Sequence, residues 1–480
     1  MSAVYAVIWA SAICINQTDD EEKTSQVQQM WNIYHQATYV AAWLGMCADN
    51  SDVLFDLIAQ LGRQLPETAL RWSRLERIKV SESDFAGLDF YPSPSDLKAL
   101  VRRTYWQRVW IQQEIRASSE IWIHCGRKRV RAEWLRFVVQ LFMAMKSSLF
   151  LDMVTDENNI ESETLGASLL DIDIGSFEAA FLTLNALRNR APLITLMKQA
   201  FGISNVLKCS DPRDRVFAFL GFASDALDLG ICPHYSKTCL QVYTETAMAL
   251  IKKDMSIMTM HNKSSDDRLA GLPSWAPDWT QPFQWPLVTL TREDIRYRAA
   301  GSTNSNLDFL YLQDGCIALS ATGCVFDLVV QHEPEELLDE SRGTHALIHT
   351  LQRIGDVTSL AQTSVFYRDF ESVCEELPTL FPDSSETETR SVALRHAVAT
   401  IKQCLQHRRL FISMRGRVGL GPPGLAQGDV LAILLGLDVP LILRKLDGNK
   451  YRIIGNAYCG GIMDGEIFKH RNKIQRLHIL

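Results

Sequence analysis

Long hydrophobic runs are scarce in this sequence of 480 residues. The best candidate, DVLAILLGLDVPLIL, is interrupted by Asp438 and Pro440 and falls short of the about 20 apolar residues that a membrane-spanning helix needs. The N-terminal stretch MSAVYAVIWASA lacks the positively charged start of a signal peptide, and its apolar run, Val4–Trp9, is too short. We therefore expect no membrane span and a soluble, cytoplasmic protein.

Paired cysteines are also missing. The eleven cysteines are scattered without a C-x-x-C pair, which argues against a zinc knuckle or a disulfide framework. Cys14 lies in an apolar run, so we expect a buried, unreactive thiol. His345 and His349 stand four residues apart, but the acidic neighbour of a zinc-protease motif is absent. We expect no metal site.

Several common catalytic motifs are absent, namely the P-loop, the G-x-S-x-G elbow and the EF-hand loop. The stretch GLGPPG, Gly419–Gly424, has the spacing of a dinucleotide-binding fingerprint. However, two prolines fill the spacer and a strand-like segment follows it instead of a helix. We interpret these residues as turn glycines and expect no bound cofactor.

An excess of positive charge is missing as well. The net charge is -7 and the pI is near 5.9, which argues against a broad nucleic-acid-binding surface. We interpret one local basic cluster as a solvated helix face; its members are Arg102, Arg103, Arg108, Arg116, Lys128 and Arg129. With 47% hydrophobic and 22% charged residues, the chain is typical of a globular protein and is long enough for two or three domains.

The first third of the chain alternates strand-like and helix-like patterns. The continuous apolar run Val4–Ile15 predicts a strand, and a capping box at Thr18–Glu21 predicts the helix Glu21–Gln36. Tyr39–Leu44 and Ile121–His124 predict two further strands. We expect these two strands and the strand Val4–Ile15 to run parallel in one sheet. Trp106–Ala117 predicts a helix that, with Glu21–Gln36, packs on the sheet, because parallel strands need helical crossovers. Asp52–Leu61 predicts another helix.

The rest of the chain changes character twice. Lys146–Ser176 reads as an acidic loop, and a helix is expected after Asp211 with Pro212 in its first turn. A largely helical middle region and a C-terminal α/β region with a β-rich tail follow. The expected elements are the helices Leu240–Lys253, His345–Ala361 and Val392–Gln406, the strands within Leu307–Val330, and the strands from Leu410 onward. The predicted domains are 1–140, 141–300 and 301–480.

Several ordered motifs resemble the fungal heterokaryon-incompatibility (HET) domain. The block YWQRVWIQQEIRASSEIWIHCG, Tyr105–Gly126, agrees with that domain, and DPRDRVFAFLG, LPSWAPDW and the tail from GLGPPG onward resemble segments of its larger members. The resemblance therefore covers most of the chain. Its N-terminal motif consists of Trp9, Ala12–Gln17 (AICINQ), Val27, Met30, Tyr34, Ala37 and Trp43–Gly45.

The resemblance implies a TIR-like fold, which is a flavodoxin-like parallel sheet with helices on both faces. It also implies a role in fungal non-self recognition, in which fusion of incompatible cells triggers programmed cell death. Some TIR domains hydrolyse NAD with a glutamate in a W-x-x-x-E-I segment. Trp110–Ile115 has that form, so the resemblance implies Glu114 as the catalytic position.

The chain departs from the family pattern in two places. Ser11 stands where the family has an aspartate. The strand and helix that open the family domain have no counterpart before Val4, so the sequence predicts an N-terminally truncated domain that lacks part of its nucleotide site.

Two interpretations of Glu114 remain open. In an N-glycosidic cleavage its carboxylate would hold the ribose hydroxyls and stabilise the developing positive charge, with Trp106 and Trp110 stacking on a ring. Alternatively, Glu114 is a helix residue paired with Arg116 or Arg108, and the tryptophans belong to the core.

Asn16 and Gln17 follow the first predicted strand, where ligands bind in such sheets, although their side chains are equally suited to closing a loop.

Two classes of function therefore follow. The first is a regulatory or death-effector protein that acts through protein contacts, including self-association through the HET domain. The second is an NAD glycohydrolase that uses Glu114, with NAD as a substrate and not as a cofactor. Outside these two classes, an accessory or relic protein encoded beside a metabolic gene cluster is a further possibility. Because the opening segment is missing, the sequence favours the first class or a non-functional relic over the enzyme, with no nucleic-acid partner.

Overall fold

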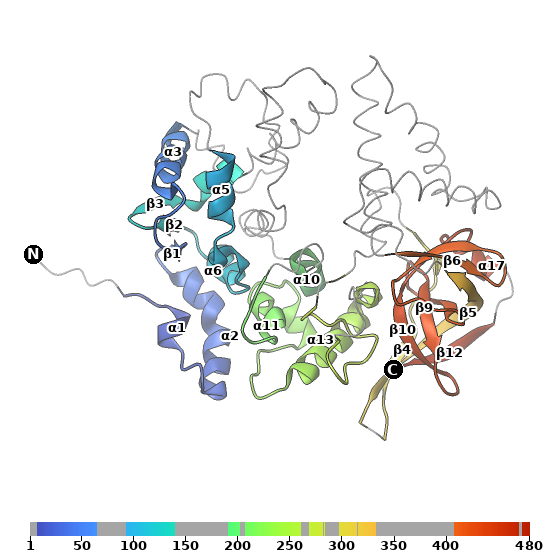
Figure 1. The fold of residues 1–480 in the computed structure, drawn as a ribbon. Coiled ribbons are helices and arrows are strands. Elements are labelled where there is room, and N and C mark those ends of the chain that lie inside the picture. The colour runs from blue at the N-terminus through green and yellow to red at the C-terminus, as the bar shows by residue number, and fades with distance from the viewer. Residues whose placement is uncertain are drawn as a thin grey trace, which may run out of the picture. The chain divides into compact units, whose positions relative to one another are not determined.

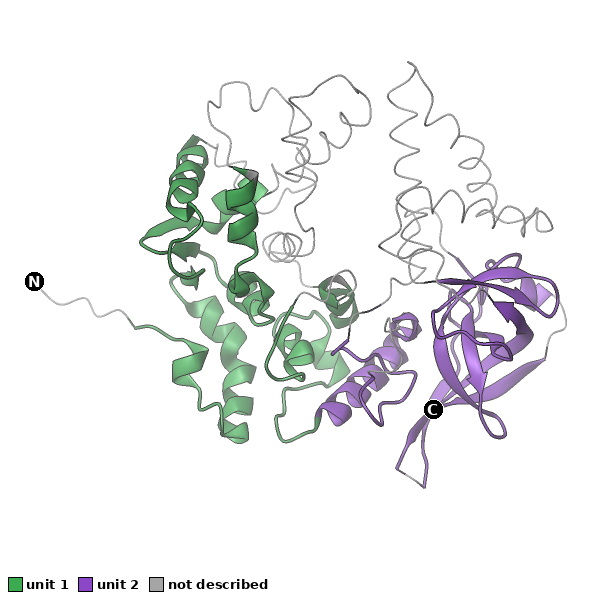
Figure 2. Ribbon diagram, viewed as in Figure 1, with its two compact units in different colours: residues 1–238 green, residues 239–480 purple. Residues whose placement is uncertain are grey.

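A computed structural model describes residues 7–64, 93–139, 191–201, 207–260, 268–281, 283, 297–313, 315–332, 408–469 and 473–480. The chain divides into two compact units, residues 1–238 and residues 239–480 (Figure 2). Each described part mixes helices with strands in a manner that confirms the α/β class. The domain boundaries expected near residues 140 and 300 stay predictions.

The first long helix of the first unit is α2, Asp20–Gln36 (Figure 1). Asp19 caps it, since its carboxylate accepts hydrogen bonds of 3.0 Å from the backbone N–H groups of Glu21 and Glu22. Val27 and Met30 are buried on one side of the helix, as their spacing predicts. This helix confirms the prediction made from the acidic capping pattern.

The sheet of the first unit combines a parallel and an antiparallel pair. Strand β1, Val40–Trp43, runs parallel to β2, Ile121–Cys125, and β2 forms a hairpin with β3, Lys128–Arg131. Both strands of the parallel pair were predicted from the sequence. The inner face of the sheet packs into a core with helices α3, Ser51–Gln64, and α5, Pro94–Val101.

The prediction of a strand over Val4–Ile15 is wrong within the described residues. Residues 7–10 are irregular, and Ser11–Cys14 forms the short helix α1. The Ala10 carbonyl accepts the N–H groups of Ile13 and Cys14, and this closes a helical turn. The physical reason is that a short, continuously apolar run shows neither the two-residue alternation of a strand nor the 3.6-residue period of a helix. Packing therefore decides between the two conformations. Consequently Cys14 is exposed, contrary to the expected buried thiol.

The single helix predicted over Trp106–Ala117 is divided into two pieces. The 3-10 helix η2, Thr104–Gln107, and the α-helix α6, Ile111–Ala117, flank a short extended segment. In that segment the Val109 N–H donates to the Lys208 carbonyl at 3.0 Å, and the Lys208 N–H donates to the Gln107 carbonyl. A pairing between residues about 100 positions apart therefore interrupts the helix.

The basic cluster is not one solvated helix face. Lys128 and Arg129 lie on β3, and Arg116 is buried in α6. Arg103 holds the turn after β1, because its guanidinium donates to the carbonyl oxygens of Leu44, Met46 and Ala48.

The first unit ends with three described helices, α10 (Leu193–Phe201), α11 (Asp214–Leu220) and α12 (Ala226–Leu229). Asp211 does precede α11 as expected, and its carboxylate accepts the Arg213 N–H at 3.0 Å, but the helix proper begins at Asp214. A turn therefore separates the predicted capping residue from the helix.

The second unit opens with α13, Cys239–Lys253, and the 3-10 helix η3, Met255–Thr259. The nine described strands that follow confirm the predicted strands and the β-rich tail; a short helix, α17 (Glu466–Lys469), precedes the last strand. The strands are β4 (Leu307–Tyr311), β5 (Ile317–His332), β6 (Arg409–Ser413), β7 (Val418–Gly421), β8 (Val430–Leu434), β9 (Leu441–Lys445), β10 (Lys450–Asn456), β11 (Tyr458–Cys459) and β12 (Ile474–Ile479).

Five of these strands close into a ring in the order β5-β12-β10-β9-β8-β5. Strand β5 is long enough to pair also with β4 at its start and with β6 at its end. Gly419 lies in β7, and a Cβ atom there would stand 2.5 Å from the Tyr458 carbonyl oxygen. GLGPPG is therefore part of a strand and the turn after it, as the absence of a following helix predicts.

Three predictions lie outside the described residues. They are the loop Lys146–Ser176 and the helices His345–Ala361 and Val392–Gln406, the first of which carries His345 and His349.

Candidate functional site

Glu114 lies in the core of the first unit. Its side chain belongs to α6 and is only 8% exposed. The Tyr105 hydroxyl donates to Glu114 Oε2 at 3.0 Å, and Arg108 Nη1 lies 3.6 Å from Oε1. Burial raises the pKa of Glu114, while Arg108 and Tyr105 oppose that change. Both carboxylate oxygens therefore already have partners within the protein.

The two predicted stacking tryptophans have different surroundings. Trp106 is fully buried, and its indole N–H donates to the Leu100 carbonyl at 3.1 Å, so it is a core residue. Trp110 is half-buried, and its indole N–H donates to Asp214 Oδ2 at 3.0 Å. Only Trp110 has a ring that borders a pocket.

Asn16 and Gln17 mainly close the loop between α1 and α2. Asn16 Oδ1 accepts from the hydroxyl and the N–H of Thr18, at 2.8 and 3.2 Å. Gln17 Nε2 donates to the Ser11 carbonyl at 3.0 Å. Asn16 faces solvent, whereas Gln17 lines the same pocket as Trp110.

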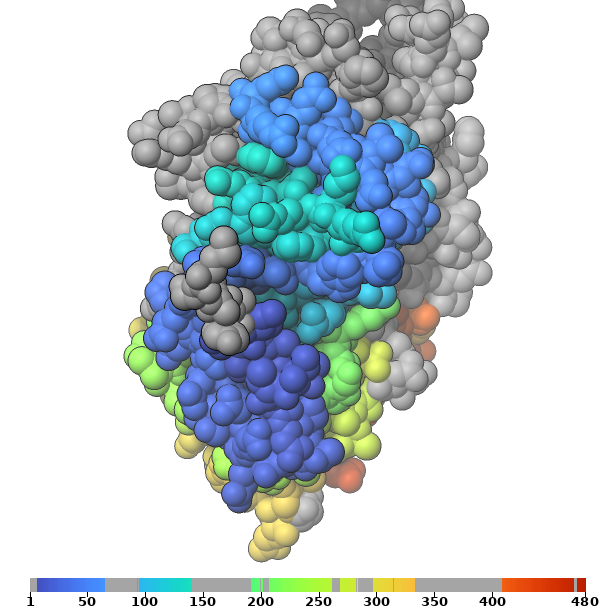
Figure 3. All heavy atoms as spheres, turned by 90° about the vertical axis from the view of Figure 1, so that its left-hand side faces the viewer, coloured from blue at the N-terminus to red at the C-terminus, as the bar shows by residue number. Residues whose placement is uncertain are grey.

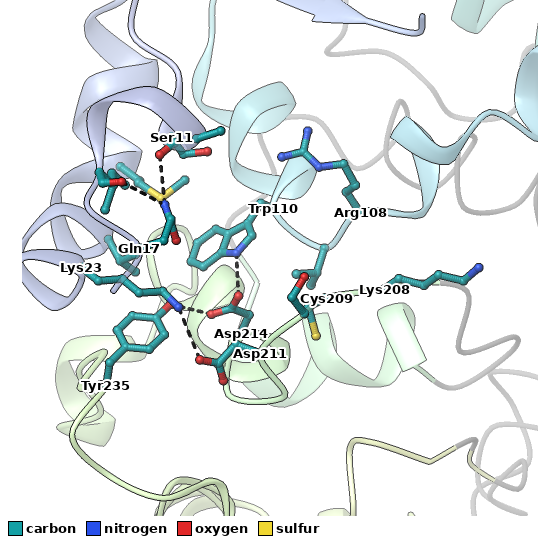
Figure 4. A pocket seen from close by; sticks show the side chains of 16 residues that line it. Ser11, Gln17, Lys23, Arg108, Trp110, Lys208, Cys209, Asp211, Asp214 and Tyr235 are labelled. Atoms are coloured by element: carbon teal, nitrogen blue, oxygen red, sulfur yellow. Dashed lines mark hydrogen bonds and ion pairs between the residues drawn. The ribbon is translucent and has the colours of Figure 1, made fainter. Parts of the chain in front are cut away.

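This pocket has a volume of about 380 Å³ and lies entirely within the first unit (Figure 4). Four separate segments of the chain build it, so no single motif encodes it. The lining residues are Ser11, Ala12, Ile15, Gln17, Lys23, Val27, Met30, Arg108, Val109, Trp110, Lys208, Cys209, Ser210, Asp211, Asp214 and Tyr235.

Asp214 is the polar centre of the pocket wall. It is 6% exposed, and the Tyr235 hydroxyl donates to its Oδ1 at 2.5 Å while Trp110 donates to its Oδ2. Burial raises the pKa of Asp214, against the two hydrogen bonds that favour its ionised form. Burial also raises the pKa of Tyr235, and the nearby Asp214 carboxylate adds to that increase. Figure 4 shows Asp214 between the two aromatic side chains.

An ionic cluster adjoins this centre. Arg213 donates to both carboxylate oxygens of Asp211, at 2.9 and 2.7 Å, and Lys23 Nζ lies 3.4 Å from Asp211 Oδ2. Burial alone would raise the pKa of Asp211, but the hydrogen bonds from Arg213 lower it below its usual range. Lys23 also lies 3.9 Å from the centre of the Tyr235 ring. The cluster ties α2 to the segment that precedes α11.

The thiol in the pocket wall is not activated as a nucleophile. Cys209 is the only cysteine among the described residues that line the pocket, and burial raises the pKa of its thiol to about 11, so it is protonated at neutral pH. The described residues also hold no group of three or more His, Cys, Asp or Glu side chains suited to a metal ion.

Sequence reasoning identified Gln17 and Trp110 but missed Asp214 and Tyr235. The segment DPRDR carried a signal, since its alternating charges around a proline are typical of an ion-pair cluster, but we interpreted Asp211 only as a helix cap. Tyr235 lies in an irregular segment and gave no sequence signal.

Comparison with known proteins agrees with these motifs. Residues 2–114 match the heterokaryon incompatibility protein (HET) family, and residues 386–477 match the Het-6 beta-barrel domain. The N-terminal part of the chain is therefore a HET domain. The HET match contains α2, the parallel pair's first strand and Glu114, and the barrel match overlaps most of the strand ring.

A curated relative matches nearly the whole chain. Heterokaryon incompatibility protein 6, OR allele, from Neurospora crassa is 24% identical, and the alignment covers 96% of this chain and 81% of that protein. No solved structure matches. Within the described part of this HET-domain protein, every helix is too short or too polar to cross a membrane. Its function is therefore of the heterokaryon-incompatibility type.

Proposed function

We propose that this HET-domain protein acts in fungal non-self recognition through contacts with other proteins in the cytoplasm, and that it needs no enzymatic step of its own to promote cell death. The observation that carries the proposal is the state of Glu114. Its carboxylate is buried and engaged by Tyr105 and Arg108, so a ribose would have to displace both partners before reaching it. Burying a polar group without its partners costs several kcal/mol, typically about 2–7.

The test compares the wild-type protein with Glu114→Gln in living fungus. Both genes are expressed from an inducible promoter in a strain that lacks the protein, and colony growth and hyphal viability are measured. Contact-mediated signalling predicts the same growth arrest for both proteins, because glutamine keeps the shape and can accept the Tyr105 hydrogen bond. Growth arrest by the wild type alone would refute it.

An NAD glycohydrolase remains the second candidate, on one specific observation. Trp110 borders a pocket of about 380 Å³ and stands four residues before Glu114 on the same helical segment, so a substrate ring bound there would lie near the carboxylate. Nicotinamide release from NAD by the purified chain decides between the two. Release that Glu114→Gln abolishes would establish the enzyme and overturn the first proposal.

A TIR-like relationship is part of the same proposal. The parallel pair β1 and β2, with helices between them in sequence, is the arrangement on which a flavodoxin-like sheet is built. The antiparallel β3 is an addition that such a sheet does not require. An experimental structure of the HET domain in which β1 and β2 are not adjacent would end the comparison.

A further inference from the structure

The three-stranded sheet of the first unit has one buried face and one open face. Val40, Ala42, Ile121 and Ile123 belong to the core, so the alternate positions point the other way. On the open face the strand register places six side chains in two rows across the sheet, Ala41–Trp122–Arg131 and Trp43–His124–Arg129. Trp43 is 51% exposed, and both arginines are exposed.

The two arginines of this open sheet face both lie over the Trp122 indole, and Arg131 also lies 5.9 Å from the ring centre of Trp134. The guanidinium carbons of Arg129 and Arg131 lie 4.6 and 5.6 Å from the ring centre of Trp122. No hydrogen bond or ion pair connects either guanidinium to another residue of the described chain. Each carries five N–H donors in a planar fork, so together they are preorganised to bind carboxylates.

The composition of this face favours a protein partner. Tryptophan and arginine are enriched where protein interfaces concentrate their binding energy, and lysine, aspartate and glutamate are depleted there. None of the six positions holds lysine or a carboxylate. A nucleic acid would require many phosphate contacts, which the net charge of -7 opposes.

The same unit carries the complementary charge. Helix α2 begins with four exposed acidic residues, of which Asp19 caps the helix and Glu22 accepts the Asn16 N–H at 2.9 Å. Asp20 and Glu21 are exposed and are not used in this way. In Figure 3 the N-terminal segment in dark blue and the β2–β3 segment in teal both face the viewer.

We propose that this side of the HET domain binds a second copy of the chain, with Arg129 and Arg131 of each copy facing Asp20 and Glu21 of the other. A two-fold axis that passes between the basic and the acidic region places the basic region of each copy against the acidic region of the other. Both contacts form in the same dimer, so the interface closes. Trp43 supplies the exposed apolar area beside the charges. The dimer is a specific form of the protein contacts proposed above and rests on that proposal for its biological role.

A charge swap tests the dimer in solution. Sedimentation equilibrium of the full chain should show a monomer–dimer equilibrium that weakens as salt is added, because exposed charges are screened. Arg129→Glu with Arg131→Glu places like charges opposite each other, and so does Asp20→Lys with Glu21→Lys. Each double variant should weaken dimerisation on the order of 100-fold.

The mixture of the two double variants is the decisive sample. In a heterodimer of the swapped copies, glutamate faces lysine at one contact and arginine faces the native acids at the other, so dimers should reappear. Glu21→Lys alone should weaken the dimer, whereas Asp447→Lys, an equal charge change at an exposed position of the second unit, should not. A wild-type chain that is monomeric throughout the micromolar range, or a mixture that stays monomeric, would overturn the proposal.

Folding and function are separated by two further measurements. Thermal unfolding of each variant shows whether it folds, and Trp43→Gln, at a half-exposed position, gives a second route to a weakened dimer. Dimerisation as described with no growth arrest in the fungus would leave the interface standing and remove the proposed function. Growth arrest without dimerisation would overturn the proposed dimer and leave the proposed function standing.

Discussion

The two units of this HET-domain protein secure their strands in different ways. In the second unit five strands form a closed ring, so each has a paired neighbour on both sides and the core between them is apolar. In the first unit the described sheet has three strands, and β1 and β3 each pair only with β2. There, buried polar side chains connect segments that are far apart in sequence, as Asp214 does with Trp110 and Tyr235.

This difference has a consequence for function. A closed ring leaves few backbone groups for a partner, whereas an open sheet with polar connections leaves a pocket and an uncovered face. The pocket around Asp214 and the open sheet face both belong to the first unit. The predictions below test that contrast.

The largest effect is expected in the barrel core. Ile433 lies in β8, is fully buried and belongs to the apolar core of the ring. Ile433→Ala should lower the free energy of unfolding by about 2–5 kcal/mol, since it removes buried methyl groups and leaves a cavity. Ile474→Ala, at a 52% exposed position of β12, is the matched control and should change little. Urea unfolding measures both, and equal effects would mean that packing does not hold the ring.

The next effect concerns the polar centre of the first unit. Asp214→Ala leaves the Trp110 N–H and the Tyr235 hydroxyl without their acceptor, and an unsatisfied buried donor costs about 1–3 kcal/mol. Asp52→Ala removes an exposed aspartate near the start of α3 and should cost less than about 0.5 kcal/mol. Tryptophan fluorescence during urea unfolding follows the transition. A stability loss no greater than that of the control would show that the hydrogen bonds of Asp214 do not stabilise the first unit.

The pH dependence should have opposite signs at two neighbouring aspartates. Asp214 has a raised pKa when folded, so its contribution to stability is largest at low pH and is lost as pH rises through the folded pKa. Asp211 has a lowered pKa, so its contribution is present above the usual carboxyl range and is lost as pH falls through the folded pKa.

This sign difference is measured with variants. Going from neutral pH to well below the usual aspartate pKa of about 4, the wild type should gain stability relative to Asp214→Asn and lose it relative to Asp211→Asn. Urea unfolding at several pH values gives both differences. Two differences of the same sign would contradict the assigned environments.

The smallest effect is expected at the turn after β1. Arg103 donates to three backbone carbonyl oxygens there, and Arg103→Ala should cost about 1 kcal/mol, because carbonyl groups lose charge-assisted hydrogen bonds to a side chain that is itself partly solvated. Arg102→Ala changes the neighbouring, exposed arginine and should be nearly neutral. Thermal unfolding compares them, and an equal loss at both positions would attribute the effect to net charge.

Much of the fold followed from local pattern. The acidic cap before α2, the alternation in β1 and β2, and the apolar runs of the tail predict their elements because they depend on near neighbours in the chain. The prediction for Val4–Ile15 was wrong over Ser11–Cys14. An apolar run indicates that residues tend to be buried, but it does not indicate whether the backbone is a strand or a helix. The long helix before Ala117 was interrupted because Val109 pairs with Lys208, a contact that no local pattern contains.

The candidate site was less predictable than the fold. Trp110 and Gln17 were found, but the sequence does not show that Trp110 meets Asp214 while Trp106, four residues earlier, enters the core. Glu114 was correctly placed on a helix, yet its burial with Tyr105 and Arg108 depends on how that helix packs.

The sequence by itself determined the HET domain, the α/β class and the order of most described elements, because motifs, caps and alternation are properties of short segments. Only the tertiary structure decided which face of the first sheet stays open, which carboxylates are buried, and that five strands of the second unit close into a ring. Those features depend on how residues that are distant in sequence pack against one another and exclude water. The free energy of that packing is a property of the whole folded molecule, and no single segment of the sequence determines it.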